Sequence, residues 1–286
     1  MNFARLPLRW QLFLPRALLH RLRYKFLRRQ YPKMLTHGGI ELTNTCNLNC
    51  KDCPTPRTGA PRGFADDATV RLAMRYARPG QLFSLHRLGE PLLHPSLVKY
   101  VRWAAGLGLQ PLVSTNGLLL DEATFHRLMR AGLANLQITL HTKKSVAALK
   151  LVTDCLCANP AYARRLTFCG NLLSHNPKAQ DWLKESAFSP QALGRIRHVA
   201  HHSWAGGLQE EKKELPPEEV RRRKALCCFI RSNIASVRWD GAVVACCFDS
   251  ENVQLLGHLR DFPRLKHEPE RYTLCNYCDA DWVLNG

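Results

Sequence analysis

The stretch Glu41-Leu-Thr-Asn-Thr-Cys46-Asn-Leu-Asn-Cys50-Lys-Asp-Cys53-Pro54 decides the fold of this 286-residue chain. Its cysteines follow a Cys-x3-Cys-x2-Cys spacing, directly after the short apolar run 40–43, which predicts a strand. Three thiolates on one short loop can hold one face of a cubane iron–sulfur cluster and leave its fourth iron open. A zinc loop completed by a distant fourth ligand is the alternative.

Short apolar runs alternate with helical patterns on both sides of this loop. We expect strands at 40–43, 82–85, 109–114, 136–140, 166–168 and 196–200, and helices at 67–77, 95–105, 121–131, 145–157 and 178–186. This alternation predicts an α/β fold with a parallel sheet, curled into a partial (β/α)6 barrel. Ligands in such folds gather at the C-terminal ends of the strands.

Two further motifs lie at expected strand ends: Arg87-Leu-Gly-Glu-Pro91 after the second strand and Ser114-Thr-Asn-Gly117 at the end of the third. Together with the cysteine loop, they make residues 38–200 resemble the radical S-adenosylmethionine (SAM) superfamily. The resemblance implies a [4Fe–4S] cluster on Cys46, Cys50 and Cys53. It also implies an enzyme that cleaves SAM reductively to a 5′-deoxyadenosyl radical, which abstracts hydrogen from a substrate. A flavodoxin- or ferredoxin-type donor would supply the electron.

The resemblance also implies which residues bind SAM. The turn that contains Gly89 and Glu90 would bind the methionine amino group, because a carboxylate and backbone carbonyls accept hydrogen bonds from an ammonium. The complete expected set is Gly89, Glu90, Pro91, Ser114, Thr115, Asn116 and His141. The family often has an aromatic residue just before the third cysteine, and Asp52 stands there instead. A side-chain contact from that position to the adenine is therefore not expected.

A second group of cysteines lies near the end of the chain. It resembles the twitch or abbreviated SPASM auxiliary domain, in which a Cys, a Gly-x4-Cys hairpin and a late Cys-x2-Cys hold a second [4Fe–4S] cluster. The ligands implied by this resemblance are Cys228, Cys246, Cys275 and Cys278. The neighbouring Cys227 and Cys247 leave the register open, and a four-cysteine zinc ribbon of a non-enzymatic binding protein is the alternative.

Four segments follow from these patterns. They are a basic amphipathic N-terminal segment (1–37), the partial barrel (38–205), a Gly-, Pro- and charge-rich linker (206–226) and a small β-hairpin/α auxiliary domain (227–286). Two other cysteines are candidate hydrogen-atom donors to a substrate radical, as in some radical epimerases. These are Cys169, after the expected fifth strand, and Cys247, beside the auxiliary cysteines. A packing role is the alternative for both.

The charge distribution indicates which classes of molecule the protein can bind. The formal net charge is +18, and residues 1–33 carry nine Lys and Arg but no Asp or Glu. Such a chain favours an anionic partner. Its N-terminal segment is a helix packed on the barrel, a contact to an anionic membrane or a docking segment for an acidic substrate.

We expect a cytoplasmic oxidoreductase-type enzyme that oxidises, epimerises or cross-links an acidic ribosomal peptide. Its basic N-terminal segment also fits a peripheral position at the membrane. Oxidation or epimerisation of a small molecule such as an aminoglycoside precursor is an alternative, which the positive charge disfavours. RNA modification is another, but no aromatic-rich nucleic-acid module is recognisable, which argues against a nucleic-acid partner.

Overall fold

The structure, a computed structural model, describes residues 15–174, 176–186, 188–199, 202–208 and 213–284. Its strands form one nine-stranded sheet in the order β6-β5-β4-β3-β2-β1-β7-β8-β9. The strands are β1 Thr36–Ile40, β2 Leu82–Ser84, β3 Gln110–Thr115, β4 Asn135–Thr139, β5 Thr167–Leu173, β6 Ile196–Val199, β7 Ile234–Val237, β8 Ala242–Val244 and β9 Leu255–His258. Strands β1 to β6 are parallel and lie in chain order. The expected α/β architecture with a parallel sheet is confirmed.

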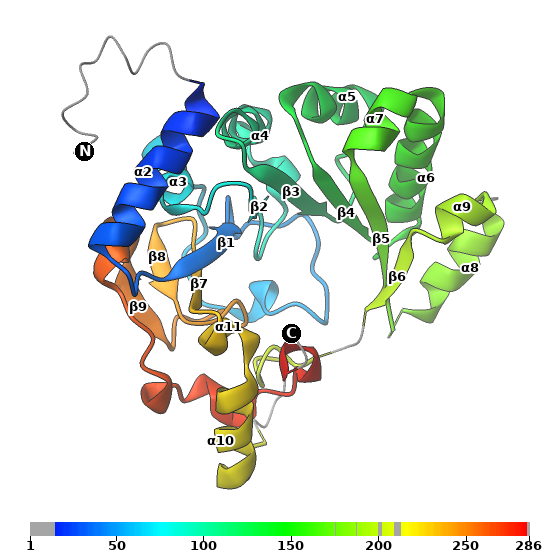
Figure 1. Cartoon of the computed structure of the whole chain (residues 1–286). Coiled ribbons are helices and arrows are strands. Elements are labelled where there is room, and N and C mark those ends of the chain that lie inside the picture. The colour runs from blue at the N-terminus through cyan, green and yellow to red at the C-terminus, as the bar shows by residue number, and fades with distance from the viewer. Residues whose placement is uncertain (1–14, 175, 187, 200–201, 209–212, 285–286) are drawn as a thin grey trace.

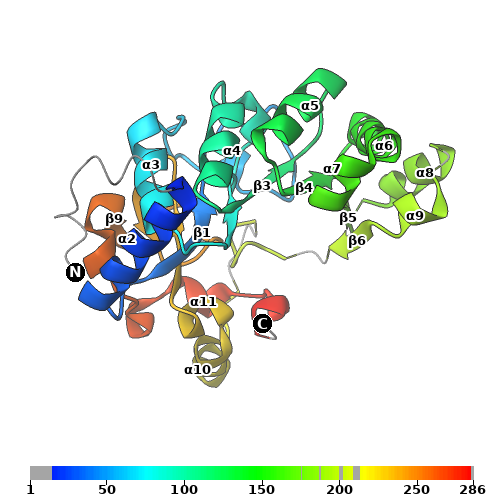
Figure 2. The same ribbon diagram turned by 45° about the horizontal axis from the view of Figure 1, so that its top comes forward.

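Helices cover the outer face of this curved sheet (Figures 1 and 2). They are α3 Asp67–Tyr76, α4 Leu97–Gly106, α5 Glu122–Ala131, α6 Lys143–Ala158, α7 Pro160–Arg165, α8 Pro177–Glu185 and α9 Pro190–Leu193. Local sequence fixes where several begin: Asp66 and Asp121 each accept a bond from a backbone N–H in the first turn of the next helix. The apolar sides of α3 to α6 and the outward side chains of the strands form the main core.

The N-terminal helix α2 Arg16–Gln30 packs on this barrel. Its His20 and Tyr24 are buried, and His20 Nε2 lies 3.0 Å from the carbonyl oxygen of Ala77, at the end of α3. The described part of the segment therefore contributes to the packed fold. Residues 1–14 of the expected amphipathic segment 1–37 lie outside the described residues. Within the described residues, no helix is long and apolar enough to cross a membrane.

The first strand was misplaced by the sequence analysis. It occupies Thr36–Ile40 instead of 40–43, and it includes Gly38 and Gly39. Because glycine is depleted in strands, the pattern of apolar residues did not predict a strand at 36–40. The structure supplies the reason for Gly39: a Cβ there would lie 1.9 Å from the carbonyl oxygen of Ser84 on β2. Close approach of these two strands requires a residue without a side chain.

The C-terminal segment is not separated from the barrel. Strand β7 pairs in parallel with β1, and β8 and β9 continue the same sheet in antiparallel order. The hairpin expected around Asp240-Gly241 is present, with Gly241 at φ +83°. The second half of the expected linker 206–226 is the helix α10 Pro217–Leu226, and the division into domains stays a prediction. Pro217 at its first position and Glu218 and Glu219 in its first turn favour a helix start.

Short helical elements complete this half of the chain. Helix α11 Cys228–Arg231 follows α10, and strand β9 was not anticipated. The 3-10 helices within the described residues are η2 Thr55–Arg57, η3 Pro91–Leu93, η4 Leu259–Arg264, η5 Pro269–Arg271, η6 Leu274–Tyr277 and η7 Asp281–Leu284. A second, smaller apolar cluster forms here around Ala205, Phe248, Leu274 and Ala280.

Candidate functional site

The first cysteine loop follows β1 at the C-terminal end of the parallel strands. Cys46, Cys50 and Cys53 are free and partly buried, and their thiols lie close enough to affect one another's ionisation. Burial, and then the neighbouring Cys53 and Cys46, raise the pKa of Cys50 to about 11. Burial likewise raises the pKa of Cys46. Such thiols favour the neutral form until a metal supplies positive charge, which is the behaviour of a metal-binding set.

Two residues from the strand ends contact this loop. His141, which follows β4, places Nδ1 3.6 Å from Cys50 Sγ. Asn116, which follows β3, donates from Nδ2 to Asn47 Oδ1 at 2.7 Å, and the same nitrogen lies 3.9 Å from Cys46 Sγ. The sequence analysis proposed both residues as SAM ligands, and the structure places both beside the cysteines. Hydrogen bonds of this kind tune the ligands of a cluster.

Glu90 is the buried centre of the second motif, with only 1% of its surface exposed. Its Oε1 accepts from Leu92 N–H at 2.9 Å and from the hydroxyl of Thr115 at 2.7 Å, and its Oε2 accepts from Asn116 N–H at 2.8 Å. Burial raises the pKa of Glu90, against the opposing effect of these donors. The carboxylate thus ties its own turn to the end of β3. A carboxylate has about four acceptor positions, so Oε2 keeps capacity for one more donor.

The turn at Gly89 depends on glycine. Its φ is +74°, and a Cβ there would lie 2.3 Å from the carbonyl oxygen of Thr43. Glu90 N–H in turn donates to the carbonyl of Thr45 at 2.8 Å. Backbone contacts therefore hold the 87–91 turn directly against the chain that leads into the cysteine loop.

Polar side chains line the concave face of the sheet. Ser114, Gln137 and Cys169 lie side by side in register on β3, β4 and β5. The next residue, Gly170, faces α6, because a Cβ there would lie 3.0 Å from Leu149. Since strand residues alternate between faces, Cys169 faces away from the helices, as expected. Cys169 is buried, Sγ lies 3.8 Å from Asn171 Oδ1, and burial raises its thiol pKa.

The second cysteine site is assembled from three separate segments. Burial raises the thiol pKa of Cys275 to about 12 and that of Cys278 to about 11, with further contributions from Cys246 and Cys227 in both cases. Cys228 instead interacts with Cys227, Cys246 and Cys247. The four mutually interacting thiols are therefore those of Cys227, Cys246, Cys275 and Cys278. The ligand set that the sequence spacing implied, which contains Cys228, stays a prediction.

A further group of candidate metal ligands lies on the outer helices, away from both cysteine sites. Among the described residues, Glu122, His126 and Cys155 have their ligand atoms within 4.8 Å of one another.

A buried ion pair connects the two sites. Arg87, at the start of the 87–91 turn, lies 3.5 Å from Glu41 and donates to the carbonyl of Asp249, just beyond the Cys246–Cys247 pair. Glu41 also accepts from Leu88 N–H at 3.2 Å. A hydrogen bond between the two thiols raises the pKa of Cys246 and lowers that of Cys247, and Arg87 lowers both.

Trp204 provides a second connection. Its indole N–H donates to the carbonyl of Asp52 at 3.0 Å, and its ring meets that of Phe248 edge-on, with 5.7 Å between centroids. An aromatic ring thus lies beside the residue before Cys53 after all, although it comes from a distant part of the chain. Trp204, Arg87 and Cys247 line a cavity of about 290 Å³ against β1, β2 and β7.

The match to a known family covers these motifs. Residues 40–151 match the radical SAM superfamily, from the last residue of β1 into α6. The chain contains a radical SAM domain. The resemblance stated from the sequence is confirmed, and with it the expectation of a [4Fe–4S] cluster and SAM as cofactors. The radical SAM match includes the cysteine loop and the turns at 87–91 and 114–117.

Curated relatives share this radical SAM domain. PqqA peptide cyclase from Gluconobacter oxydans is 32% identical over 191 residues, which is 63% of this chain and 53% of that protein. GTP 3',8-cyclase from Moorella thermoacetica is 32% identical over 121 residues, 40% of this chain and 37% of that one. The chain thus spans about half, or less, of the length of these relatives.

Solved structures share the fold. BtrN in complex with AdoMet and 2-DOIA has a TM-score of 0.56 at 18% identity and covers 88% of this chain and 96% of its own. SuiB from Streptococcus suis, bound to the precursor peptide SuiA, has a TM-score of 0.50 at 12% identity, with 93% and 70% covered. At these identities the likeness concerns the radical SAM fold alone.

Several residues of the site were missed by sequence reasoning. Glu41, Arg87 and Asp249 come from three distant segments, and Trp204 and Asn47 carried no motif. One signal was available: Glu41 and Arg87 flank the two recognised motifs, and charged residues are rarely buried without a partner. The predicted contacts of Gly89, Pro91, Ser114 and the other SAM-binding candidates with the cofactor stay predictions.

Proposed function

We propose that the protein is a radical SAM enzyme that oxidises, epimerises or cross-links a ribosomal peptide, with two [4Fe–4S] clusters. The observation that carries the peptide substrate is the 32% identity to PqqA peptide cyclase over 191 residues, a longer stretch than the 112 residues from 40 to 151 that match the superfamily. A net charge of +18 supports an acidic peptide. We place the enzyme in the cytoplasm, where a flavodoxin- or ferredoxin-type protein is the electron donor.

Cys46, Cys50 and Cys53 hold the cluster that binds SAM in this proposal. When bound, the cluster and SAM supply a radical that removes a hydrogen atom from the substrate. The Gly89–Pro91 turn and Ser114, Thr115, Asn116 and His141 position SAM. Glu90 does so in two ways: it fixes the turn to β3 through Thr115 and Asn116, and it offers the remaining acceptor position of Oε2 to the methionine ammonium.

The second site holds an auxiliary cluster with Cys227, Cys246, Cys275 and Cys278 as ligands. The interactions of Cys275 and Cys278 with Cys227 and Cys246 support this assignment. Arg87 and Trp204 hold the auxiliary site against the SAM site. Cys247, in the cavity between them, and Cys169, on the concave face, are the two thiols available to return a hydrogen atom to the substrate.

The experiment uses anaerobically reconstituted protein, SAM and a reductant, with peptides encoded by neighbouring genes. Mass spectrometry distinguishes the outcomes: loss of two hydrogens indicates oxidation or cross-linking, and gain of one deuterium from D2O indicates epimerisation. In the epimerisation case, Cys169→Ala or Cys247→Ala should stop deuterium incorporation but leave SAM cleavage intact. Unmodified peptides together with oxidation of an aminocyclitol would replace the peptide with a small-molecule substrate. Bound zinc without sulfide would end the proposal.

A further inference from the structure

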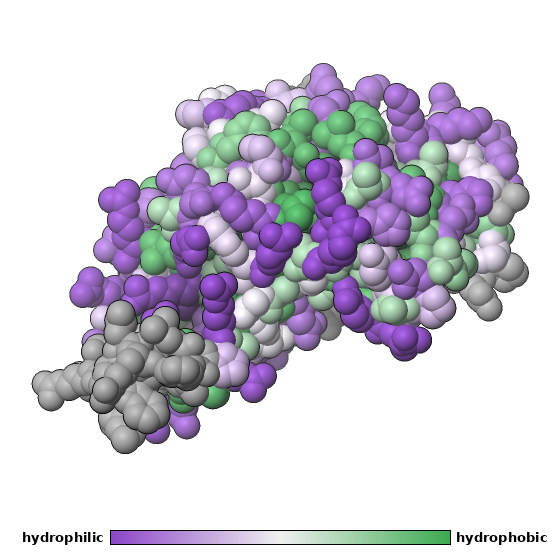
Figure 3. Space-filling view, turned by 90° about the horizontal axis from the view of Figure 1, so that it is seen from above, coloured by the Kyte–Doolittle hydropathy of each residue, from purple (hydrophilic) through white to green (hydrophobic). Residues whose placement is uncertain are grey.

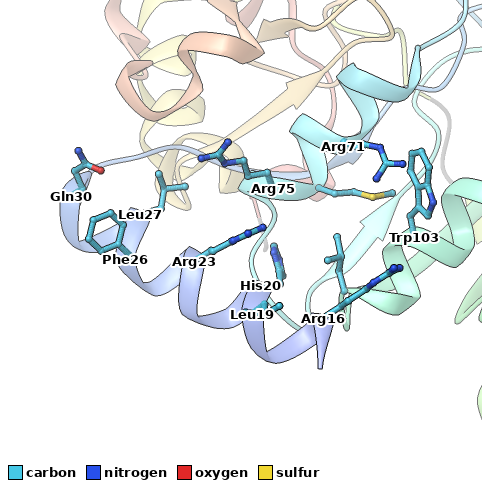
Figure 4. Close-up of a pocket in the computed structure, with 12 residues that line it drawn as sticks. Arg16, Leu19, His20, Arg23, Phe26, Leu27, Gln30, Arg71, Arg75 and Trp103 are labelled. Carbon is cyan, nitrogen blue, oxygen red and sulfur yellow. The ribbon is translucent and has the colours of Figure 1, made fainter. Parts of the chain in front are cut away.

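A groove on the outer side of the molecule has no role in the chemistry described above. It lies between α2 and the helices α3 and α4, and its volume is about 850 Å³ (Figure 4). Its lining includes residues at both ends of α2, from Arg16 to Gln30. A helix of 15 residues is about 22 Å long, so the groove is an elongated channel and not a compact pocket.

The charges of the groove are all of one sign. Arg16 and Arg23 come from α2, Arg71 and Arg75 come from α3, and no carboxylate belongs to the lining. None of these four guanidinium groups forms an ion pair with a described carboxylate of the chain. Arg71 does lower the pKa of Asp67, but that carboxylate is bonded to Lys99 and Tyr100, which have the larger effect. The groove therefore attracts negative charge.

The floor of the groove is apolar. Leu27 and Phe26 of α2 and Trp103 of α4 line it, and 42% of the Phe26 surface is exposed. Arg71 stacks over the Trp103 ring at 3.6 Å, so one cation is held at the edge of this floor. Seen from above, the molecule shows apolar areas between hydrophilic side chains (Figure 3). A ligand that fills the groove needs both negative charges and apolar side chains.

We propose that this groove binds an acidic amphipathic segment of the peptide substrate, at a distance from the reacting residue. The inference rests on the proposed function only in naming the segment as part of the substrate. An acidic peptide can place apolar side chains on the floor while its carboxylates meet the arginines at the rim. A flat bilayer can reach the rim but not the floor between the helices. The chain's own residues 1–14 carry Arg5 and Arg9 and no acid, so their charge does not match the groove.

Binding can be measured directly on the reconstituted full-length protein. The probe is a fluorescein-labelled amphipathic helix with glutamates on one side and leucine and phenylalanine on the other, and anisotropy reports its Kd. We expect binding that weakens with salt. Arg71→Glu/Arg75→Glu should raise the Kd at least tenfold, about the effect of reversing two exposed charges. The matched control is Arg102→Glu/Arg130→Glu, which changes net charge equally at two exposed helical positions outside the groove.

Several results would overturn the groove assignment. They are equal Kd values for the groove and control variants, binding to anionic phosphatidylglycerol vesicles in place of the peptide, and peptide binding that requires removal of residues 2–14. Activity separates this inference from the proposed function. If the groove variant modifies a true substrate with an unchanged KM, the groove does not bind the substrate, and the proposed function still holds. If the probe binds but no peptide is modified, the groove stands and the function is wrong.

Discussion

The two cysteine sites are built in opposite ways. The first takes all its thiols from eight consecutive residues, 46–53, and the second takes them from three segments between 227 and 278. The family resemblance therefore predicts a single set of thiol ligands for the first site. In the second site, Cys227 and Cys228 lie at the start of α11, and the turn of the backbone there determines which thiol points toward the other cysteines. That turn depends on packing and not on sequence spacing. In a local motif, the short chain between the ligands limits their relative positions. In a site assembled from distant segments, the tertiary fold sets those positions.

The largest expected effect comes from removing the first site. Cys46→Ala/Cys50→Ala/Cys53→Ala should abolish SAM cleavage and lower iron from about eight to about four per chain, because one of two cubanes is lost. Iron and sulfide analysis and SAM turnover measure this. Cys157→Ala, at an exposed position outside both sites, is the control and should change neither quantity. Full iron content in the triple variant would show that this loop holds no cluster.

The second prediction tests the register of the assembled site. Cys227→Ser should lower iron from about eight to about four, while Cys228→Ser should retain both clusters, because Cys227 is among the thiols that raise the pKa of Cys275 and Cys278. Both variants should keep basal SAM cleavage, since the first site is intact. Iron analysis and absorption spectra provide the measurement. The reverse result would restore Cys228, the choice made from sequence spacing.

The third prediction concerns Glu90, which supports the first site from the neighbouring strand end. Glu90→Gln replaces one accepting oxygen with a donor that faces the N–H or O–H groups of Thr115 and Asn116. The SAM Kd should rise about ten- to a hundredfold, equivalent to about 1.5–3 kcal/mol for a hydrogen bond to a charged group. Isothermal titration with iron-loaded protein measures it, and the exposed Glu251→Gln is the control. A lower melting temperature with unchanged SAM affinity would assign Glu90 a structural role alone.

The smallest effect concerns β1, the strand that pairs with β2 on one side and with β7 of the auxiliary half on the other. Burial lowers the pKa of His37 on this strand to about 4, although the carbonyls of Gly39 and Ala73 oppose the shift. An unfolded histidine has a pKa of about 6.5, so below that pH the unfolded chain binds a proton that the folded chain does not. Stability contributed by neutral His37 is therefore lost as pH falls through 6.5.

Chemical unfolding at pH 7.5 and 5.5 measures this loss. Between these values the wild type should lose about 1.4 kcal/mol more than His37→Gln, which has no proton to gain. An equal loss in both proteins would mean that His37 is accessible to protons in the folded state. In that case, protonation of His37 on β1 would not explain a loss of both clusters at low pH.

Sequence patterns captured the elements whose side-chain periodicity is strong. The helices α3, α5 and α6 and the strands β3 and β4 lie within two residues of their predicted bounds, because their apolar residues recur at the helical or strand period. Strand β1 was shifted and β9 missed, since glycines in the one and a short, half-exposed run in the other give little periodic signal.

By itself, the sequence determined the radical SAM domain, its three cysteines and the turns at Gly89 and Asn116, because each is a short motif whose chemistry depends on neighbours in the chain. Tertiary structure alone decided that Glu90 is tied to β3, that Arg87 and Trp204 connect the two cysteine sites, and that four arginines from two helices converge on one groove. Those contacts join residues between 25 and 162 positions apart. The pairing of β1 with β2 and β7 and of β2 with β3, and the packing of α2 on α3, bring such residues together, and no local pattern encodes them.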